Sequence, residues 1–373
     1  MSRNFQHERL AAARDIRGRT GKSIAEAAQI SDEWFSAILR GRKTPQPETV
    51  AAFAKTLDFP EDFFFRPIEL EPPADAFHFR ASSRLAKKDE GAARGLSVIA
   101  MELCEWMDET YNLPTAAVPE LQDLVGGDVP LEPEQAAESL RLEWGLGYRP
   151  IKNLLQLMEA KGIRVFSAGG PIKAIDAFSF RNGATPVVFL NVHKSLERIR
   201  FDLAHELGHL VLHSGSFNVD AGRQKEQEAN DFAAAFLMPR SDVLGSVRGN
   251  ISTERVLDLK SRWGVSAMAL TFRLHKLGVL SEWVYRMQCQ QLASRGFRSG
   301  EPTSILRPEQ SSLLTQLLDD LRGRGSGFLE IAQAVNVRSQ DIRDLTLGLV
   351  PPSTGRPEQA PGIVHLSAVR NLA

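Results

Sequence analysis

Apolar residues recur at helical spacing over most of the chain, which predicts a mainly α-helical protein. In residues 5–66 the predicted helices are short. One of them, residues 32–40, follows Ser31, a residue type that caps helix N-termini, and ends at Gly41, a common helix stop. Two short helices joined by a tight turn at residues 29–30 are typical of a helix-turn-helix.

The pattern changes after residue 66. Residues 69–75 include two consecutive prolines and are predicted to be a linker. Residues 87–112 show one long apolar stripe and predict a single long helix. A proline-rich, loop-like stretch follows up to residue 133, and two further helices are predicted at residues 134–144 and 153–160.

Short runs rich in β-branched and aromatic residues predict a small sheet in the middle of the chain. They occur at residues 163–166, 177–180 and 186–191. The last two flank Arg181-Asn182-Gly183 and are predicted to form a hairpin. Helical spacing returns from His193, and Leu196, Ile199, Leu203 and Leu207 share one face.

Helices are predicted again at residues 225–237, 253–277 and 311–349. Residues 330–342 resemble the helix-turn-helix pattern near the start of the chain. They are either a second helix-turn-helix or a packed helical cap. We therefore expect four parts: a helix-turn-helix domain (1–67), a linker with a long connecting helix (68–130), a central α+β domain (131–295) and a helical C-terminal region (296–373).

Composition narrows the class of protein. The chain has 373 residues, of which 43% are hydrophobic and 24% charged, and its net charge is −1. This length predicts several domains, and the charge gives no general attraction to nucleic acid or membranes. No apolar run is long enough to span a bilayer, and the N-terminus lacks a signal-peptide core. Only two cysteines are present, without a Cys-x-x-Cys pair, so we expect a cytoplasmic protein without structural disulfides.

The sequence His205-Glu206-Leu207-Gly208-His209 carries the most specific chemistry. On a helix, His205 and His209 lie one turn apart on the same face, so two imidazoles can bind one tetrahedral Zn²⁺. Glu206 is then placed to accept a proton from the attacking water. His213 continues the spacing, but it would lie about 12 Å from His205 along a continuous helix, which is too far for a shared ion.

The third protein ligand is predicted to be a carboxylate from the following helix. Glu226 and Glu228 are the candidates. We favour Glu228, because it lies beside the buried face formed by Ala229 and Phe232. Both acids would also be favourable at a solvated helix N-terminus without any metal.

Two segments carry a family resemblance. Residues 200–213 resemble the core signature of ImmA/IrrE-type metallopeptidases, and residues 228–239 resemble the second signature of that family. The hairpin ending at Asn191 and the segment Trp263-Gly264-Val265-Ser266 also fit. The resemblance extends over residues 77–295.

The resemblance implies a gluzincin-like zinc fold, with His205, His209 and Glu228 as ligands and Glu206 as the general base. It also implies that the strand before the motif helix, residues 186–191, forms a sheet edge that holds an extended peptide. An oxyanion stabiliser is needed as well, and His213 and His275 are the candidates; His213 is equally suited to a supporting role. The substrate class that the resemblance implies is a repressor-type protein, cut in stress or mobile-element responses.

Residues 5–66 resemble the Xre/Cro-type helix-turn-helix found fused to such peptidases. Residues 32–40 would be the recognition helix, and the candidate DNA-binding residues are Ser31, Ser36, Arg40, Arg42 and Lys43. The sequence departs from the pattern with Gly21 and Gln29, and the helix opens with two acids. This segment holds ten basic and nine acidic residues, so its attraction to phosphates is weak. DNA binding and docking of a protein, including a second copy as a homodimer, both remain open.

Two functions follow from these observations. The first is a zinc endopeptidase that cleaves a regulatory protein, and the complete set of His205, Glu206, His209 and Glu228 favours it. The second is a DNA-binding transcription regulator whose peptidase-like domain acts as a sensor or scaffold. A site without catalysis has no need of Glu206, which favours the enzyme.

Overall fold

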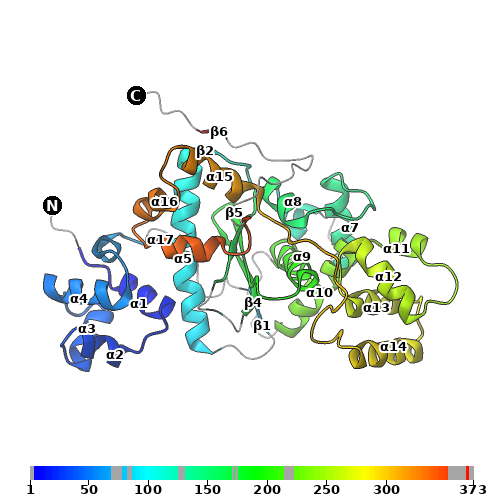
Figure 1. Cartoon of the computed structure of the whole chain (residues 1–373), viewed down its shortest axis with the longest axis horizontal. Coiled ribbons are helices and arrows are strands. Elements are labelled where there is room, and N and C mark those ends of the chain that lie inside the picture. Colours follow the sequence, from blue (N-terminus) through cyan, green and yellow to red (C-terminus); the bar gives the residue numbers. More distant parts are fainter. Residues whose placement is uncertain are drawn as a thin grey trace.

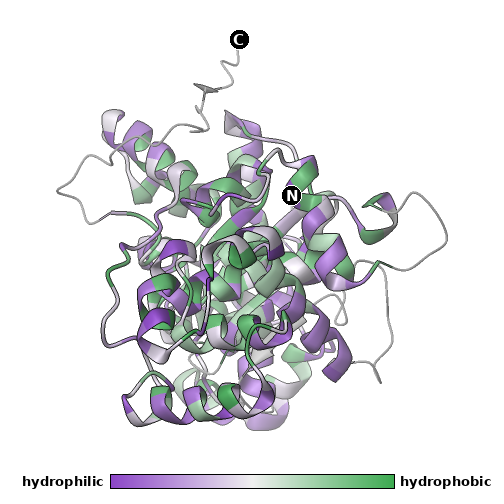
Figure 2. Ribbon diagram, turned by 90° about the vertical axis from the view of Figure 1, so that its right-hand side faces the viewer, coloured by the Kyte–Doolittle hydropathy of each residue, from purple (hydrophilic) through white to green (hydrophobic). Residues whose placement is uncertain are grey.

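The computed structural model describes residues 4–68, 78–81, 86–124, 131–169, 172, 175–213, 222–351 and 367–368. The protein is mainly helical with one small sheet at its centre, which confirms the predicted fold class (Figure 1). Hydrophobic segments gather in the interior of the ribbon, and hydrophilic ones are commoner at its periphery (Figure 2). The linker predicted at residues 69–75 lies outside the described residues.

The N-terminal module consists of α1 (His7–Ile16), α2 (Gly21–Ala27), α3 (Asp32–Leu39), α4 (Pro47–Leu57) and a 3-10 helix (Glu61–Phe65). Helices α2 and α3 form the predicted helix-turn-helix. The side chains of Thr20 and Ser31 accept hydrogen bonds from the first turns of these helices. Gln29 has a φ of 55°, in the left-handed region that favours glycine, so the turn keeps its geometry although a glutamine stands there.

A long helix separates this module from the sheet. Helix α5 (Lys87–Thr110) is the predicted connecting helix, and α1 packs along it. The buried guanidinium of Arg9 on α1 forms an ion pair with Glu102 of α5. The elements that lead to the sheet are β2 (Tyr111–Asn112), α6 (Leu121–Leu124), α7 (Pro133–Glu143) and α8 (Leu154–Ala160).

The central sheet has the strand order β1-β4-β5-β3. The predicted hairpin is present as β4 (Ile175–Asn182) and β5 (Thr185–Leu190), and β3 (Arg164–Ser167) pairs parallel to β5. The strand β1 (His78–Ala81) pairs antiparallel to β4 and was not expected from the sequence. Because β5 has a partner on each side, the prediction that residues 186–191 form a free edge is wrong.

Two helices pack closely against each other beside the sheet. They are α9 (Leu196–Leu212) and α10 (Gly222–Leu237), and α9 also contacts β4 and β5. At their crossing, a Cβ on Gly208 would lie 3.1 Å from the Phe232 ring and 3.3 Å from the Ala229 Cα. The helices that follow are α11 (Arg240–Ser246), α12 (Thr253–Trp263), α13 (Ala267–Lys276) and α14 (Glu282–Ser294).

The C-terminal region folds as α15 (Ser312–Gly323), α16 (Phe328–Ala334) and α17 (Ser339–Thr346), and β6 (Ser367–Ala368) pairs with β2. Asn336, between α16 and α17, has a φ of 54°, matching that of Gln29. The turn of the sequence echo therefore shares this one backbone feature with the turn between α2 and α3. These helices also pack against other parts of the protein, because α17 contacts β3 and its Asp341 accepts hydrogen bonds from Arg17 of 2.6 and 3.0 Å.

A buried carboxylate attaches the C-terminal region to the central domain. Glu159 of α8 is 1% exposed and accepts hydrogen bonds from the backbone amides of Ser312 and Leu313 and from the Ser311 hydroxyl. Burial raises the pKa of Glu159 to about 7, although these hydrogen bonds act to lower it. The folded protein therefore binds a proton at Glu159 more tightly than the unfolded chain does.

We predict that this group makes stability fall as the pH rises. The contribution should decrease between pH 4.5, the ordinary pKa, and about pH 7, by roughly 3 kcal/mol at most, and stay constant above. Thermal unfolding midpoints across pH 4–8 should show this decrease in the wild type and in a surface control, Glu143→Gln. In Glu159→Gln it should be absent; an unchanged pH profile in that variant would contradict the assignment.

Candidate metal centre

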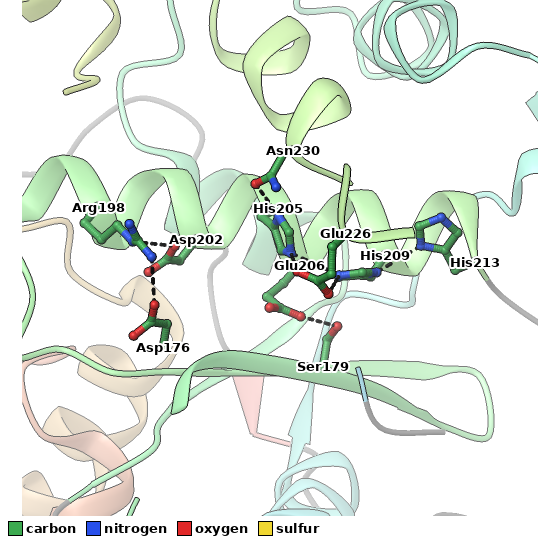
Figure 3. A network of polar contacts seen from close by, with 10 residues as sticks. All are labelled: Asp176, Ser179, Arg198, Asp202, His205, Glu206, His209, His213, Glu226 and Asn230. Carbon is green, nitrogen blue, oxygen red and sulfur yellow. Dashed lines mark hydrogen bonds and ion pairs between the residues drawn. The ribbon is translucent and has the colours of Figure 1, made fainter. Parts of the chain in front are cut away.

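Helix α9 brings the three residues of the central motif together inside the protein. His205 and Glu206 are fully buried, and His209 is 1% exposed. The Nε2 atoms of His205 and His209 lie 3.0 Å apart, because residues four apart share a helix face. Figure 3 shows both imidazoles pointing toward the same point between α9 and α10.

A carboxylate of α10 completes this cluster, and it belongs to Glu226. Its oxygens lie 3.3 Å from the Nε2 of His205 and 3.2 Å from the Nε2 of His209. Glu228, which the sequence favoured, contacts His213 instead, at 2.9 Å. The reason is which side of α10 is turned toward α9. Glu226 lies one turn before Ala229, which packs on Gly208 of α9, whereas Glu228 lies to the side of that contact.

The three donor groups fit a tetrahedral zinc ion. Zn–N and Zn–O bonds of roughly 2.0–2.1 Å give ligand-to-ligand distances of about 3.3 Å in a tetrahedron. The distances here are 3.0 to 3.3 Å. Two imidazoles and one carboxylate are also a donor set that zinc prefers, and three protein ligands leave a fourth position for water or substrate.

Neighbouring side chains orient the two imidazoles. Asn230 Oδ1 lies 3.0 Å from His205 Nδ1, so it directs the opposite nitrogen toward the cluster. His213 Nδ1 lies 2.9 Å from His209 Nδ1. Burial lowers the pKa of His213 to about 4, although its hydrogen bond to Glu228 acts to raise it. Because His213 contacts the Nδ1 atom of His209, it lies on the side of that ring away from the two clustered Nε2 atoms.

Glu206 is anchored to the sheet. The hydroxyl of Ser179 on β4 donates a hydrogen bond of 2.6 Å to Glu206 Oε2 (Figure 3).

Burial acts to raise the pKa of Glu226, but hydrogen bonds from His205 and His209 outweigh it and hold that pKa below its usual range. The cluster thus presents an ionised carboxylate beside two imidazoles.

A second polar network fixes the start of α9. Asp176 of β4 accepts contacts from Lys194, at 2.8 Å, and from Arg198, at 2.7 Å. Arg198 also lies 3.3 Å from Asp202, one turn further along α9. Burial acts to raise the pKa of Asp176, but the two cations lower it below its ordinary value. The helix that carries the cluster is therefore attached to β4 at two points.

The other predicted site residues lie elsewhere. His275 is near the end of α13, where it contacts Leu280 and Glu282 and stacks on Tyr285, so none of its contacts involves the cluster. In the N-terminal module, the Ser31 hydroxyl is used as the cap of α3. The remaining candidates there lie at least partly at the surface: Ser36, Arg40, Arg42 and Lys43.

Two family models match parts of the chain. Residues 158–275 match the IrrE N-terminal-like domain of the M78 peptidase family. Residues 8–62 match a helix-turn-helix domain. The chain therefore carries a region similar to a helix-turn-helix domain and, after it, a region similar to the IrrE N-terminal-like domain. No curated protein matches it, and no described helix is long and apolar enough to cross a membrane.

Sequence reasoning missed two residues that support this centre. Ser179 is one of several small residues on a buried strand, and nothing in its neighbours marks it. The spacing of Asn230 did indicate a place near the centre, because it lies one helical turn after the candidate ligand Glu226 and so shares its helix face.

We expect Glu226 and Glu228 to differ in their effect on metal binding. Glu226→Ala should weaken zinc binding by more than about 100-fold, because it removes a direct donor. Glu228→Ala should weaken it by about tenfold or less, because it acts through His213. Competition with a chromophoric chelator measures both affinities. The opposite ranking would restore Glu228 as the third ligand.

Proposed function

We propose that the protein is a zinc-dependent endopeptidase. The observation that carries the proposal is the cluster of His205, His209 and Glu226, with donor atoms 3.0 to 3.3 Å apart and a buried Glu206 beside them. The metallopeptidase-type domain match supports the same reaction class. Zinc bound there would polarise the scissile carbonyl and make water a stronger acid.

The protein's own residues divide the remaining work. Glu206 accepts the proton of the attacking water and passes it to the leaving amine. Ser179 holds the Glu206 carboxylate through one oxygen, which fixes the direction of the other. Asn230 and His213 keep the two imidazoles in position, so that their Nε2 atoms point to the same place.

The substrate that we propose is a regulatory protein of the repressor type. The fusion to a helix-turn-helix domain supports this choice, because that module would bring the peptidase to DNA or to a protein bound there. The exposed side of α3 begins with Asp32 and Glu33, which repel phosphates. We therefore regard docking onto a protein as an equal use of the module.

The test of the proposed reaction is the variant Glu206→Gln. It should bind zinc as the wild type does but lose at least about 100-fold in kcat/KM, because it cannot accept the water proton. Cleavage of candidate repressors is followed by mass spectrometry after zinc loading. The surface variant Glu143→Gln serves as the control. Equal cleavage by Glu206→Gln and wild type would overturn the mechanism.

A further inference from the structure

A second concave site lies on the opposite face of α9 from the two imidazoles. It has a volume of about 460 Å³. Leu196, Ile199 and Leu203 of α9 line it, and these residues share one helix face. The remaining walls are formed by Val192 just before α9, residues 150–155 at the start of α8, the end of α12 with Gly264, and two C-terminal segments, residues 306–309 and 348–349. Five separate segments of the chain therefore build this cavity.

The cavity is apolar inside. Leu155, Leu203, Trp263 and Leu349 contribute buried side chains. The walls also contain apolar side chains that are only partly buried, namely those of Ile151, Val192, Leu196, Ile199 and Leu306. A concave site of this size, lined mainly by apolar groups with a few polar ones, is typical of small-molecule binding.

The charged residues of the lining are nearly all cations. The one acid, Glu309, forms an ion pair with Arg200, and Arg262 is paired with Asp242. Lys152 and Arg307 also line the cavity, are exposed, and form no ion pair within the described part of the chain. The charge that a ligand would meet at the entrance is therefore positive.

We infer that this cavity binds an organic anion with an apolar body, such as a medium-chain carboxylate. The apolar part would lie against Ile199 and Leu306, and the anionic group would lie near Lys152 and Arg307. This inference is independent of the proposed peptidase activity.

The cavity is linked physically to the helix of the metal centre. The guanidinium of Arg200 donates to the carbonyls of Trp263 and Ile151 and to Glu309. Glu309 in turn accepts hydrogen bonds from the first amides of α8, at 2.8 and 2.9 Å. His205 lies five residues after Arg200, about 7.5 Å along α9. A ligand in the cavity would thus contact the helix that carries the imidazoles.

Isothermal titration calorimetry of the full chain with decanoate tests this inference. We expect saturable binding, weakened about tenfold or more in the double variant Lys152→Glu, Arg307→Glu. The control reverses two exposed cations away from the cavity, Lys22→Glu and Lys55→Glu, and should bind as the wild type does. Decylamine should not bind. Equal affinity in both double variants, or equal binding of decylamine, would overturn the proposal.

A different observation concerns the edge of the sheet beside Glu206. Strand β1 pairs with β4 in a register that places His78 opposite Ser179, the residue whose hydroxyl holds Glu206. Strand β1 comes from the segment between the helix-turn-helix module and α5. The other edge of the sheet belongs to β3, which α17 contacts.

The geometry points to β1 as an internal competitor of the substrate, an inference that rests on the proposed function. An extended peptide that is added as a strand next to Glu206 needs the outer edge of β4. One edge pairs with one strand at a time, because each backbone N–H and C=O there has a single partner position. Substrate must therefore displace β1, which lies just after the helix-turn-helix module.

Peptide binding tests this competition without requiring catalysis. In the Glu206→Gln background, we replace Phe79 and Arg80 by proline, because one of these two consecutive backbone N–H groups faces β4 and is thereby removed. A labelled peptide with the sequence of residues 76–83 should bind this variant about tenfold or more tightly than the parent. Fluorescence anisotropy measures both affinities.

The control for this experiment is Lys87→Pro, at the first position of α5, where proline is tolerated. It should bind the peptide as weakly as the parent does. Equal affinity in the double-proline variant and the parent would overturn the competition. Failure of the proposed peptidase function would instead appear as absence of Glu206-dependent cleavage, whatever the peptide affinities are.

Discussion

The close contact between α9 and α10 is the constraint on which the metal centre depends. Gly208 lies between the two histidines in sequence, and any side chain there would press on Ala229 and Phe232. Because the helices touch at this point, Glu226 and Asn230, on either side of Ala229, reach the two imidazoles. Zinc ligands must agree to within a few tenths of an ångström, so a wider helix separation would lose the cluster.

Polar anchors hold α9 in the place that this contact requires. Asp176 fixes its first turns through Arg198, Ser179 holds Glu206 in its middle, and Arg200 ties it to the C-terminal segment. Buried charges are costly unless paired, so these groups favour one position of the helix over others. The metal centre is therefore built on a helix that is held at three points, two of them on β4 and one in the C-terminal segment.

The sequence predicted the parts of this centre that depend on local spacing. The placing of His205, Glu206 and His209 follows from the helical repeat, and the hairpin of β4 and β5 follows from two β-type runs on either side of Arg181-Asn182-Gly183. The third donor depends on how α10 is rotated against α9, which single-helix periodicity does not define; the sequence therefore favoured Glu228 over Glu226. The sheet order also depends on distant segments. Strand β1 exists only because it pairs with β4, almost 100 residues later, so no local pattern indicated it.

The modules at the two ends of the chain meet each other as well as the central domain. Arg17, just after α1, donates to Asp341 of α17, and Arg66 donates to the Ala334 carbonyl at 2.8 Å. Arg338 lies 3.2 Å from Asp58. Two carboxylates join the C-terminal region to the central domain. Glu159 of α8 accepts from an amide at the start of α15, and Glu309 accepts from an amide at the start of α8, and a carboxylate is favoured at such a helix start. A shift of the helix-turn-helix module would therefore act on α17, which packs on β3. A shift of residues 306–309 would act on Arg200 of α9 through its ion pair with Glu309. Within the described residues, the N-terminal module thus contacts α17, which packs on the sheet, and residues 306–309 contact the helix that carries the metal centre.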